Sequence, residues 1–196
     1  FFGWEDPGAA FAAVVQIGTM AAVLLFFRAD LWRMARALLH TLTGDRPLWR
    51  TADPDGKLGW FIVLGTLPII VVGVLLRHQI KTALRSLYVM SAALAGVALL
   101  LALAEWWMRR REANRVHGRN VNEADWKDAI VVGCAQCAAL VPGTSRSGAT
   151  ILGGLCSGLS REAAARFSFL LSIPAVFAAG VFELVEAREQ LLSSSI

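Results

Sequence analysis

The sequence is poor in charged residues, which limits the classes of protein it can represent. Asp, Glu, Lys and Arg make up 17% of the 196 residues, against 56% that are hydrophobic. This balance excludes an ordinary soluble domain and is typical of an integral membrane protein. The formal charge of +4 does not indicate nucleic-acid binding, because the basic residues are spread over short loops between apolar runs.

Residues that build disulfide, zinc or nucleotide sites are scarce as well. The three cysteines all lie in apolar sequence: Cys134, Cys137 and Cys156. We expect buried, unpaired thiols, because no second ligand pair for zinc is present. The three histidines lie in predicted loops without metal-ligand spacing and are expected to be exposed: His40, His78 and His117. No Gly-Lys-Ser/Thr loop follows a strand, which excludes a Walker nucleotide site.

Four apolar runs are predicted to cross a bilayer as helices. They cover residues 9–27, 58–76, 86–106 and 166–185. A run of 19 residues is about 29 Å long as a helix, close to the thickness of the hydrocarbon core. The basic residues concentrate in the first and third loops, so the positive-inside rule places these loops in the cytoplasm and the start of the chain outside. The chain starts with neither a signal peptide nor Met, and we expect it to be an internal piece of a longer protein.

A polar break separates two half-length apolar segments between the third and fourth predicted spans. The segments at 129–141 and 148–159 are too short to cross, and residues 142–150 read PGTSRSGAT. We expect a re-entrant helical hairpin at residues 129–159, which is tolerated only where it is buried in protein or lines a cavity. The alternative is one long kinked helix over the same residues.

Arg146 in this break is the strongest single signal in the sequence. A cationic side chain at membrane depth costs about 2.5–3.5 kcal/mol even on the mildest insertion scale, so it normally marks a pathway, a partner or a bound anion. The guanidinium fork suits bidentate contact with phosphate, and the start of the second helix, capped by Thr144, Ser145 or Ser147, would offer N–H donors. The alternative is a buried carboxylate partner, but no Asp or Glu lies inside the uncharged stretches at 9–27, 58–76, 86–104 and 167–182.

Other polar side chains near membrane depth support the same reading less strongly. Ser145, Ser147 and Thr150 offer hydroxyl groups beside Arg146, although hydroxyls in membrane helices commonly bond back to their own helix. Gln136 precedes the break and Gln16 lies in the middle of the first predicted span. Helix–helix hydrogen bonding explains either glutamine adequately.

From residue 136 to residue 182 the sequence resembles the bacitracin-resistance family of undecaprenyl-diphosphate phosphatases. The resemblance rests on PGTSRSGAT, on GGL at 153–155, on GLSR at 158–161 and on FSFLL at 167–171, with a looser likeness at FAAVVQIG, residues 11–18. It implies an all-α polytopic membrane protein with an inverted repeat. Two re-entrant hairpins would meet in the middle of the membrane, and the one predicted here would be the second.

The resemblance also implies an activity, the hydrolysis of undecaprenyl diphosphate to undecaprenyl phosphate and phosphate. In the bacterial inner membrane this reaction recycles the lipid carrier for peptidoglycan synthesis and confers bacitracin resistance. Carried over by position, the catalytic residues would be Arg146, Ser145 and Thr150. The substrate-binding residues would be Gly143, Thr144, Ser147, Gln136 and Gln16.

Part of the family's site has no counterpart in this chain. A divalent cation, Mg²⁺ or Ca²⁺, would be held by a pair of glutamates of the family's first hairpin, which would precede Phe1. This chain by itself is therefore expected to hold half of an active site. The expected partners are the polyprenyl diphosphate substrate and membrane lipids but no nucleic acid, and the oligomeric state is left open, with a homodimer among the alternatives.

Two other functions remain open at the level of sequence. One is a carrier or flippase for lipid phosphates without hydrolysis, because broken helices and inverted repeats are common in transporters. The other is a structural membrane subunit, in which Arg146 would matter for stability alone. A nucleophile or metal-binding carboxylate facing Arg146 would distinguish hydrolysis from transport.

Overall fold

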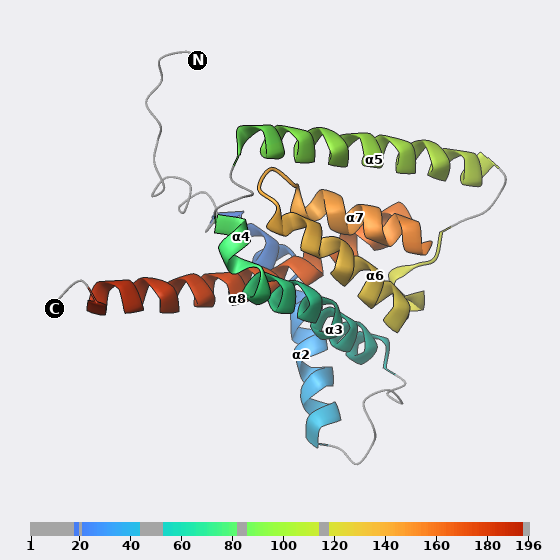
Figure 1. The fold of residues 1–196 in the computed structure, drawn as a ribbon. Helices are drawn as coiled ribbons and strands as arrows, with labels where there is room; N and C mark the ends of the chain where they lie inside the picture. The colour runs from blue at the N-terminus through green and yellow to red at the C-terminus, as the bar shows by residue number, and fades with distance from the viewer. Residues whose placement is uncertain (1–17, 20, 44–52, 82–85, 114–117, 194–196) are drawn as a thin grey trace.

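The computed structural model describes residues 18–19, 21–43, 53–81, 86–113 and 118–193, and these residues are almost entirely helical (Figure 1). They contain seven named α-helices: α2 (Arg28–Thr43), α3 (Pro54–Leu75), α4 (Arg77–Lys81), α5 (Leu87–Ala113), α6 (Trp126–Gln136), α7 (Arg146–Ser157) and α8 (Arg161–Ser193). Two 3₁₀ turns, η2 (Val121–Glu123) and η3 (Cys137–Leu140), complete the set. The all-α class predicted from the sequence is confirmed.

Two helices of the described part, α3 and α5, are long and apolar enough to cross a membrane. They correspond to the second and third predicted spans but differ from them at the ends. Helix α3 starts at Pro54, before the predicted residue 58, because the Asp53 side chain accepts a hydrogen bond from the N–H of Asp55 at 3.1 Å and caps the helix. Helix α5 continues past residue 106 to Ala113.

The first and last predicted spans fit the structure differently. Most of the run at 9–27 lies outside the described residues, although residues 21–26 are helical. The run at 166–185 lies inside α8, a single helix of 33 residues that continues through Pro174. Helix α8 starts earlier than the apolar run because Ser160 accepts a hydrogen bond from the N–H of Ala163 at 3.2 Å.

Helices α6 and α7 are separate and lie side by side, with α5 along one side of the pair (Figure 1). The chain turns back between them, so one long kinked helix is wrong. Helix α7 begins at Arg146 rather than at the predicted residue 148. Of the three capping residues considered, Ser145 is the N-cap, and its Oγ accepts a hydrogen bond from the N–H of Gly148 at 3.2 Å.

Glycine residues let α6 pack closely against α3 and against α7. A Cβ atom on Gly133 of α6 would lie 2.4 Å from the carbonyl oxygen of Gly65 in α3. A Cβ atom on Gly153 of α7 would lie 2.7 Å from the Cβ of Ala135. Small residues at helix contacts are the usual way in which membrane helices gain close van der Waals packing. Helix α6 is therefore packed tightly against both α3 and α7.

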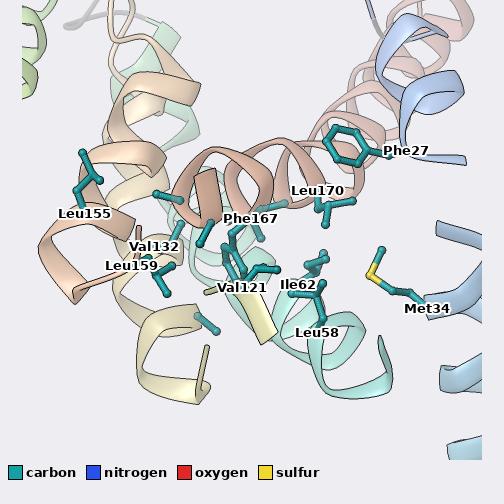
Figure 2. Packing of buried hydrophobic residues seen from close by; sticks show 14 of the residues in the cluster. Phe27, Met34, Leu58, Ile62, Val121, Val132, Leu155, Leu159, Phe167 and Leu170 are labelled. Atoms are coloured by element: carbon teal, nitrogen blue, oxygen red, sulfur yellow. The ribbon is translucent and has the colours of Figure 1, made fainter. Parts of the chain in front are cut away.

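The buried core lies where α8 meets α3 and α7, and Ala129 and Val132 of α6 contribute to it. Figure 2 shows Phe167 of α8 in the middle of this cluster, near Val121 and Ile62. Phe167, Leu170 and Leu171 have no exposed surface. Helix α8 therefore closes the core on the side where the helix pair meets α3.

Arg119 joins the start of α6 to the end of α7. Its guanidinium donates to both carboxylate oxygens of Asp128, at 2.6 and 2.9 Å, and to the carbonyl of Ser157 at 2.9 Å. Its backbone N–H donates to Gly158 and its carbonyl accepts from Ser160. The pKa of Arg119 is raised because its guanidinium donates to the buried Asp128 carboxylate. The start of α6, the end of α7 and the start of α8 are thus held at one point.

Several smaller sequence expectations need correction. His40 lies in α2 and His78 in α4, not in loops, while His117 lies outside the described residues. Cys134 and Cys156 are exposed rather than buried, because they lie on helix faces turned away from the core. Such faces can be apolar in a membrane protein, where lipid replaces water around them.

The contact of Gly133 with Gly65 can be tested by adding one methyl group. Gly133→Ala is expected to lower the free energy of unfolding by about 1–3 kcal/mol, because the obstructing atoms are backbone and cannot rotate away. Thermal unfolding in detergent measures the change. Gly96→Ala in α5 is the matched control, since a Cβ there meets nothing within 4 Å and Ala favours a helix. Equal effects of the two substitutions would contradict the close contact.

Removal of the Arg119 side chain is expected to lower the free energy of unfolding as well. Arg119→Gln leaves the Asp128 carboxylate buried, at 2% side-chain exposure, without its cation. We expect a cost of about 3 kcal/mol, the low end for a broken buried pair because Arg119 is itself partly exposed. Arg109→Gln removes the same charge from an exposed pair and is expected to cost less than about 1 kcal/mol.

Candidate functional site

The candidate site is the tip of the helix pair, where the chain turns between η3 and α7. Gly143 adopts φ +92°, a conformation that favours glycine, and a Cβ there would lie 2.4 Å from the carbonyl oxygen of Met90 in α5. The N–H of Thr144 closes the turn by donating to Val141 at 3.1 Å. Gly143 thus has two structural reasons to be glycine, independent of any ligand. Thr144 is half-buried in the turn.

The first turn of α7 presents polar groups at this tip. Ser145 and Ser147 are exposed, and their hydroxyl oxygens lie 3.3 Å apart. The backbone N–H groups of Arg146 and Ser147 have no acceptor among the described residues, whereas the N–H of Gly148 donates to Ser145. Two hydroxyls and two N–H donors therefore face the same small region, which suits an anion.

Arg146 differs from most arginines of the described part of the chain. Its Nε is buried without a hydrogen-bond partner, and its guanidinium makes no ion pair with any described residue. By contrast, Arg161 pairs with Glu105 at 2.8 Å and Arg166 pairs with Asp30 at 2.9 Å. A buried donor on a charged group is costly to leave unpaired. The arrangement therefore favours an anionic ligand at Arg146, as the sequence predicted.

The charge of Arg146 matters more here than the helix dipole. The tip brings the C-terminal end of α6 and η3, which carries partial negative charge, next to the N-terminal end of α7, which carries partial positive charge. These opposed ends partly cancel. A full positive charge on the side chain is thus the main reason for an anion to prefer this place.

Thr150 lies one turn further along α7, and its hydroxyl is directed into the protein. It donates toward the carbonyls of Arg146 and Ser147, at 2.9 and 3.2 Å, and lies 2.5 Å from the hydroxyl of Ser168 in α8. Both hydroxyls are buried, at 1% and 2% exposure. Because the Thr150 hydrogen is used by the helix carbonyls, Ser168 is the donor in the pair.

Ser168 is the residue of this region that the sequence analysis missed. A single serine in the apolar run FSFLL is usually explained by a bond to its own helix, and nothing in the spacing connects it with Thr150, 18 positions earlier. The signal in the sequence was that Thr150 lies in PGTSRSGAT and Ser168 in FSFLL, two of the segments that resemble the family.

The two glutamines assigned to the site have different outcomes. Gln136, at the end of α6, is fully buried, and neither atom of its side-chain amide has a partner among the described residues. It makes no hydrogen bond with Arg146 or the serines, so its role in binding stays a prediction. Gln16 lies outside the described residues.

The described residues do not offer a metal site at the tip. They contain no cluster of three or more His, Cys, Asp or Glu side chains. A cavity of about 360 Å³ lies elsewhere, between α2, α3 and α8, and is lined almost wholly by apolar side chains such as Met34, Ile62 and Leu170. This cavity contains none of the predicted site residues and carries no polar chemistry.

Comparison with known proteins gives a consistent result over the whole chain. Residues 1–196 match the model of the family described as bacitracin resistance protein BacA. The chain is 52% identical over 192 residues to an undecaprenyl-diphosphatase of Chlorobium phaeobacteroides (strain BS1), which covers 98% of this chain and 67% of that protein. Undecaprenyl-diphosphatases of Prosthecochloris aestuarii and Chlorobaculum tepidum are 50% and 49% identical, with the same coverage.

The chain spans about two thirds of the length of these relatives. The match of the family model covers the tip of the helix pair, the Arg119 junction and the core around α8 alike. On this evidence the chain belongs to the bacitracin resistance protein BacA family.

Proposed function

We propose that the chain forms part of an undecaprenyl-diphosphatase, which hydrolyses undecaprenyl diphosphate to undecaprenyl phosphate and phosphate. The observation that carries this proposal is the unpaired Arg146 at the start of α7, in a chain about half identical to relatives of that name. The reaction consumes one water and breaks the bond between the terminal phosphorus and the bridging oxygen. Bacitracin resistance and recycling of the lipid carrier follow from this activity.

The tip of the helix pair supplies charge stabilisation for this reaction. Phosphoryl transfer depends mainly on positioning and on neutralising the phosphate oxygens. The guanidinium of Arg146 would bind the diphosphate through its terminal nitrogens, and the N–H groups of Arg146 and Ser147 would bind a further oxygen. Ser145 and Ser147 are exposed at the same place and can donate hydroxyl hydrogens.

Thr150 does not contact the substrate in this proposal. Its hydroxyl is buried and bonded to the first turn of α7 and to Ser168, so it orients Arg146 instead of contacting phosphate. Ser168 holds that turn against α8. Positioning of this kind is valuable because a small displacement of a catalytic group lowers the rate strongly.

The helix pair would be a re-entrant hairpin that enters from the cytoplasm in a multi-pass inner-membrane protein. The Arg119 junction lies at its base, beside the basic end of α5, and Gly143 at its tip lies against Met90 in the first turn of α5. Met90 and Trp106 are roughly 24 Å apart along the helix, at 1.5 Å per residue. The tip would therefore lie nearer the outer surface than the mid-membrane depth expected from the sequence.

A divalent cation, Mg²⁺ or Ca²⁺, remains a prediction for the complete enzyme. The described residues offer no set of carboxylates near Arg146 that could hold it. Its ligands would come from the first hairpin of the inverted repeat, which the family resemblance implies. The residues of this chain bind and orient the diphosphate whether or not that cation is bound.

Substitution of Arg146 tests the proposal in protein extended to the full length of the relatives. Arg146→Gln is expected to lower the rate of phosphate release from undecaprenyl diphosphate by roughly 10²–10³-fold, because a donor to developing negative charge is lost. Arg146→Lys keeps the charge but loses the fork and should remain well below wild type. Arg77→Gln removes an exposed arginine of α4 and is the control. Undiminished release by Arg146→Gln would refute the assignment.

The hydroxyl pair predicts a measurable coupling between α7 and α8. Ser168→Ala and Thr150→Val, combined in a double-mutant cycle, are expected to show a coupling of about 0.6–1.7 kcal/mol in the free energy of unfolding in detergent. Ser168→Ala should also lower kcat more than it raises KM. Additive effects on stability would show that the two hydroxyls do not interact.

A further inference from the structure

Two groups of basic residues in the described part of the chain differ in their partners. Five arginines pair with carboxylates: Arg33, Arg109, Arg119, Arg161 and Arg166. Four other cations lie over tryptophan rings and have no carboxylate partner among the described residues: Arg36, Arg110, Arg111 and Lys127. The first group joins helices to one another, except for Arg109, whose partner is on its own helix. The second group faces outward.

The four cation–tryptophan pairs lie on three different helices. The guanidinium carbon of Arg110 lies 3.8 Å from the centroid of the Trp106 ring, and those of Arg111 and Arg36 lie 4.7 and 4.6 Å from Trp107 and Trp32. The ammonium of Lys127 lies 5.8 Å from Trp126. All are within the range of a cation–π interaction.

The tryptophan rings themselves remain accessible. The four side chains have exposed fractions between 43% and 61%, the smallest that of Trp107 and the largest that of Trp32. Each ring therefore has one face toward its cation and much of its remaining surface turned away from the protein.

Ion pairs and backbone hydrogen bonds link the helices that carry the four pairs to the N-terminal part of α8. Arg161, in the first turn of α8, pairs with Glu105 beside the α5 tryptophans. Arg119 ties the start of α6 to the same turn of α8, and Arg166 pairs with Asp30 in the first turn of α2. The helix ends that carry the stacked pairs are thus gathered around the start of α8. We call the four pairs the tryptophan–cation surface.

We infer that the tryptophan–cation surface binds the phosphate groups of anionic phospholipids at the edge of the membrane. Trp106 and Trp107 directly follow the apolar part of α5, a helix able to cross a bilayer, which is where tryptophan meets the headgroups. A cation held on the ring face keeps N–H donors directed toward neighbouring phosphates, and no described carboxylate competes for them. Zwitterionic headgroups carry their own ammonium and bind such cations less well.

A protein or nucleic-acid partner fits the same surface less well. The rings lie beside apolar helix surface that lipid must cover, so the cations face headgroups before they face any soluble partner. The inference does not depend on the proposed enzymatic activity. It predicts enrichment of anionic lipid around the protein even in a variant of Arg146.

Tryptophan quenching by brominated lipid tests this inference, because bromine quenches only tryptophans that it contacts. The protein, extended to the length of its relatives, is reconstituted in phosphatidylcholine with a minor fraction of phosphatidylglycerol, and bromine is placed on one lipid or the other. We expect quenching by the brominated phosphatidylglycerol to exceed its mole fraction. Each basic residue near an anionic surface contributes about fivefold to lipid association.

Two single substitutions in the same turn of α5 test whether anionic lipid is attracted by the tryptophan-stacked cations or only by the net positive charge. Arg110→Gln removes a stacked cation and should reduce the relative association of phosphatidylglycerol by about fivefold. Arg109→Gln removes the same charge from a residue paired with Glu105 and should change it by less than about twofold. Both variants keep every tryptophan, and quenching by brominated phosphatidylcholine verifies that the rings have not moved.

Each result bears on the inference. Preference for phosphatidylglycerol that falls in Arg110→Gln and persists in Arg109→Gln supports it. Absence of any preference in the wild-type protein overturns it. Equal losses in the two variants also overturn it, because they would show attraction to net charge without a role for the tryptophan-stacked cations.

Discussion

The junction at Arg119 holds together the part of the structure that matters for function. One guanidinium satisfies a buried carboxylate at the start of α6 and a carbonyl at the end of α7, while its backbone bonds to the residues that lead into α8. Helix ends carry backbone groups that need partners, and burial makes unsatisfied ones expensive. With the base of the helix pair held in this way, the geometry of the tip depends on the turn at Gly143 and on contacts with α5 and α8.

The sequence was informative where the membrane imposes a simple rule. Apolar length predicted α3 and α5, and the polar, glycine-containing break predicted that α6 and α7 are separate helices. The buried arginine without a partner was also predicted, since no carboxylate lies within the uncharged apolar stretches of the sequence. Each of these conclusions follows from local sequence and from the cost of placing polar groups in lipid.

Contacts between distant segments could not be predicted in the same way. Arg119 is one of several basic residues in its loop, and only its position in space distinguishes it from the tryptophan-stacked Arg110 and Arg111. Ser168 and Thr150 meet because α7 and α8 pack at a particular register. The helix ends shifted by a few residues for a related reason: side-chain caps such as Asp53 and Ser145, rather than hydrophobicity, decide where a helix begins.

The close approach of Gly143 to Met90, and of Gly133 to Gly65, has a consequence for the order in which the protein is assembled. Two short helices with a polar turn cannot be inserted as an independent transmembrane segment, so they need a prepared place between other helices. Both α3 and α5 are synthesised before the helix pair, and α8 is synthesised after it. The order of the elements along the chain thus provides α3 and α5 first and the helix pair with Arg146 at its tip next. Helix α8 comes last, and its Phe167 and Ser168 pack against the pair.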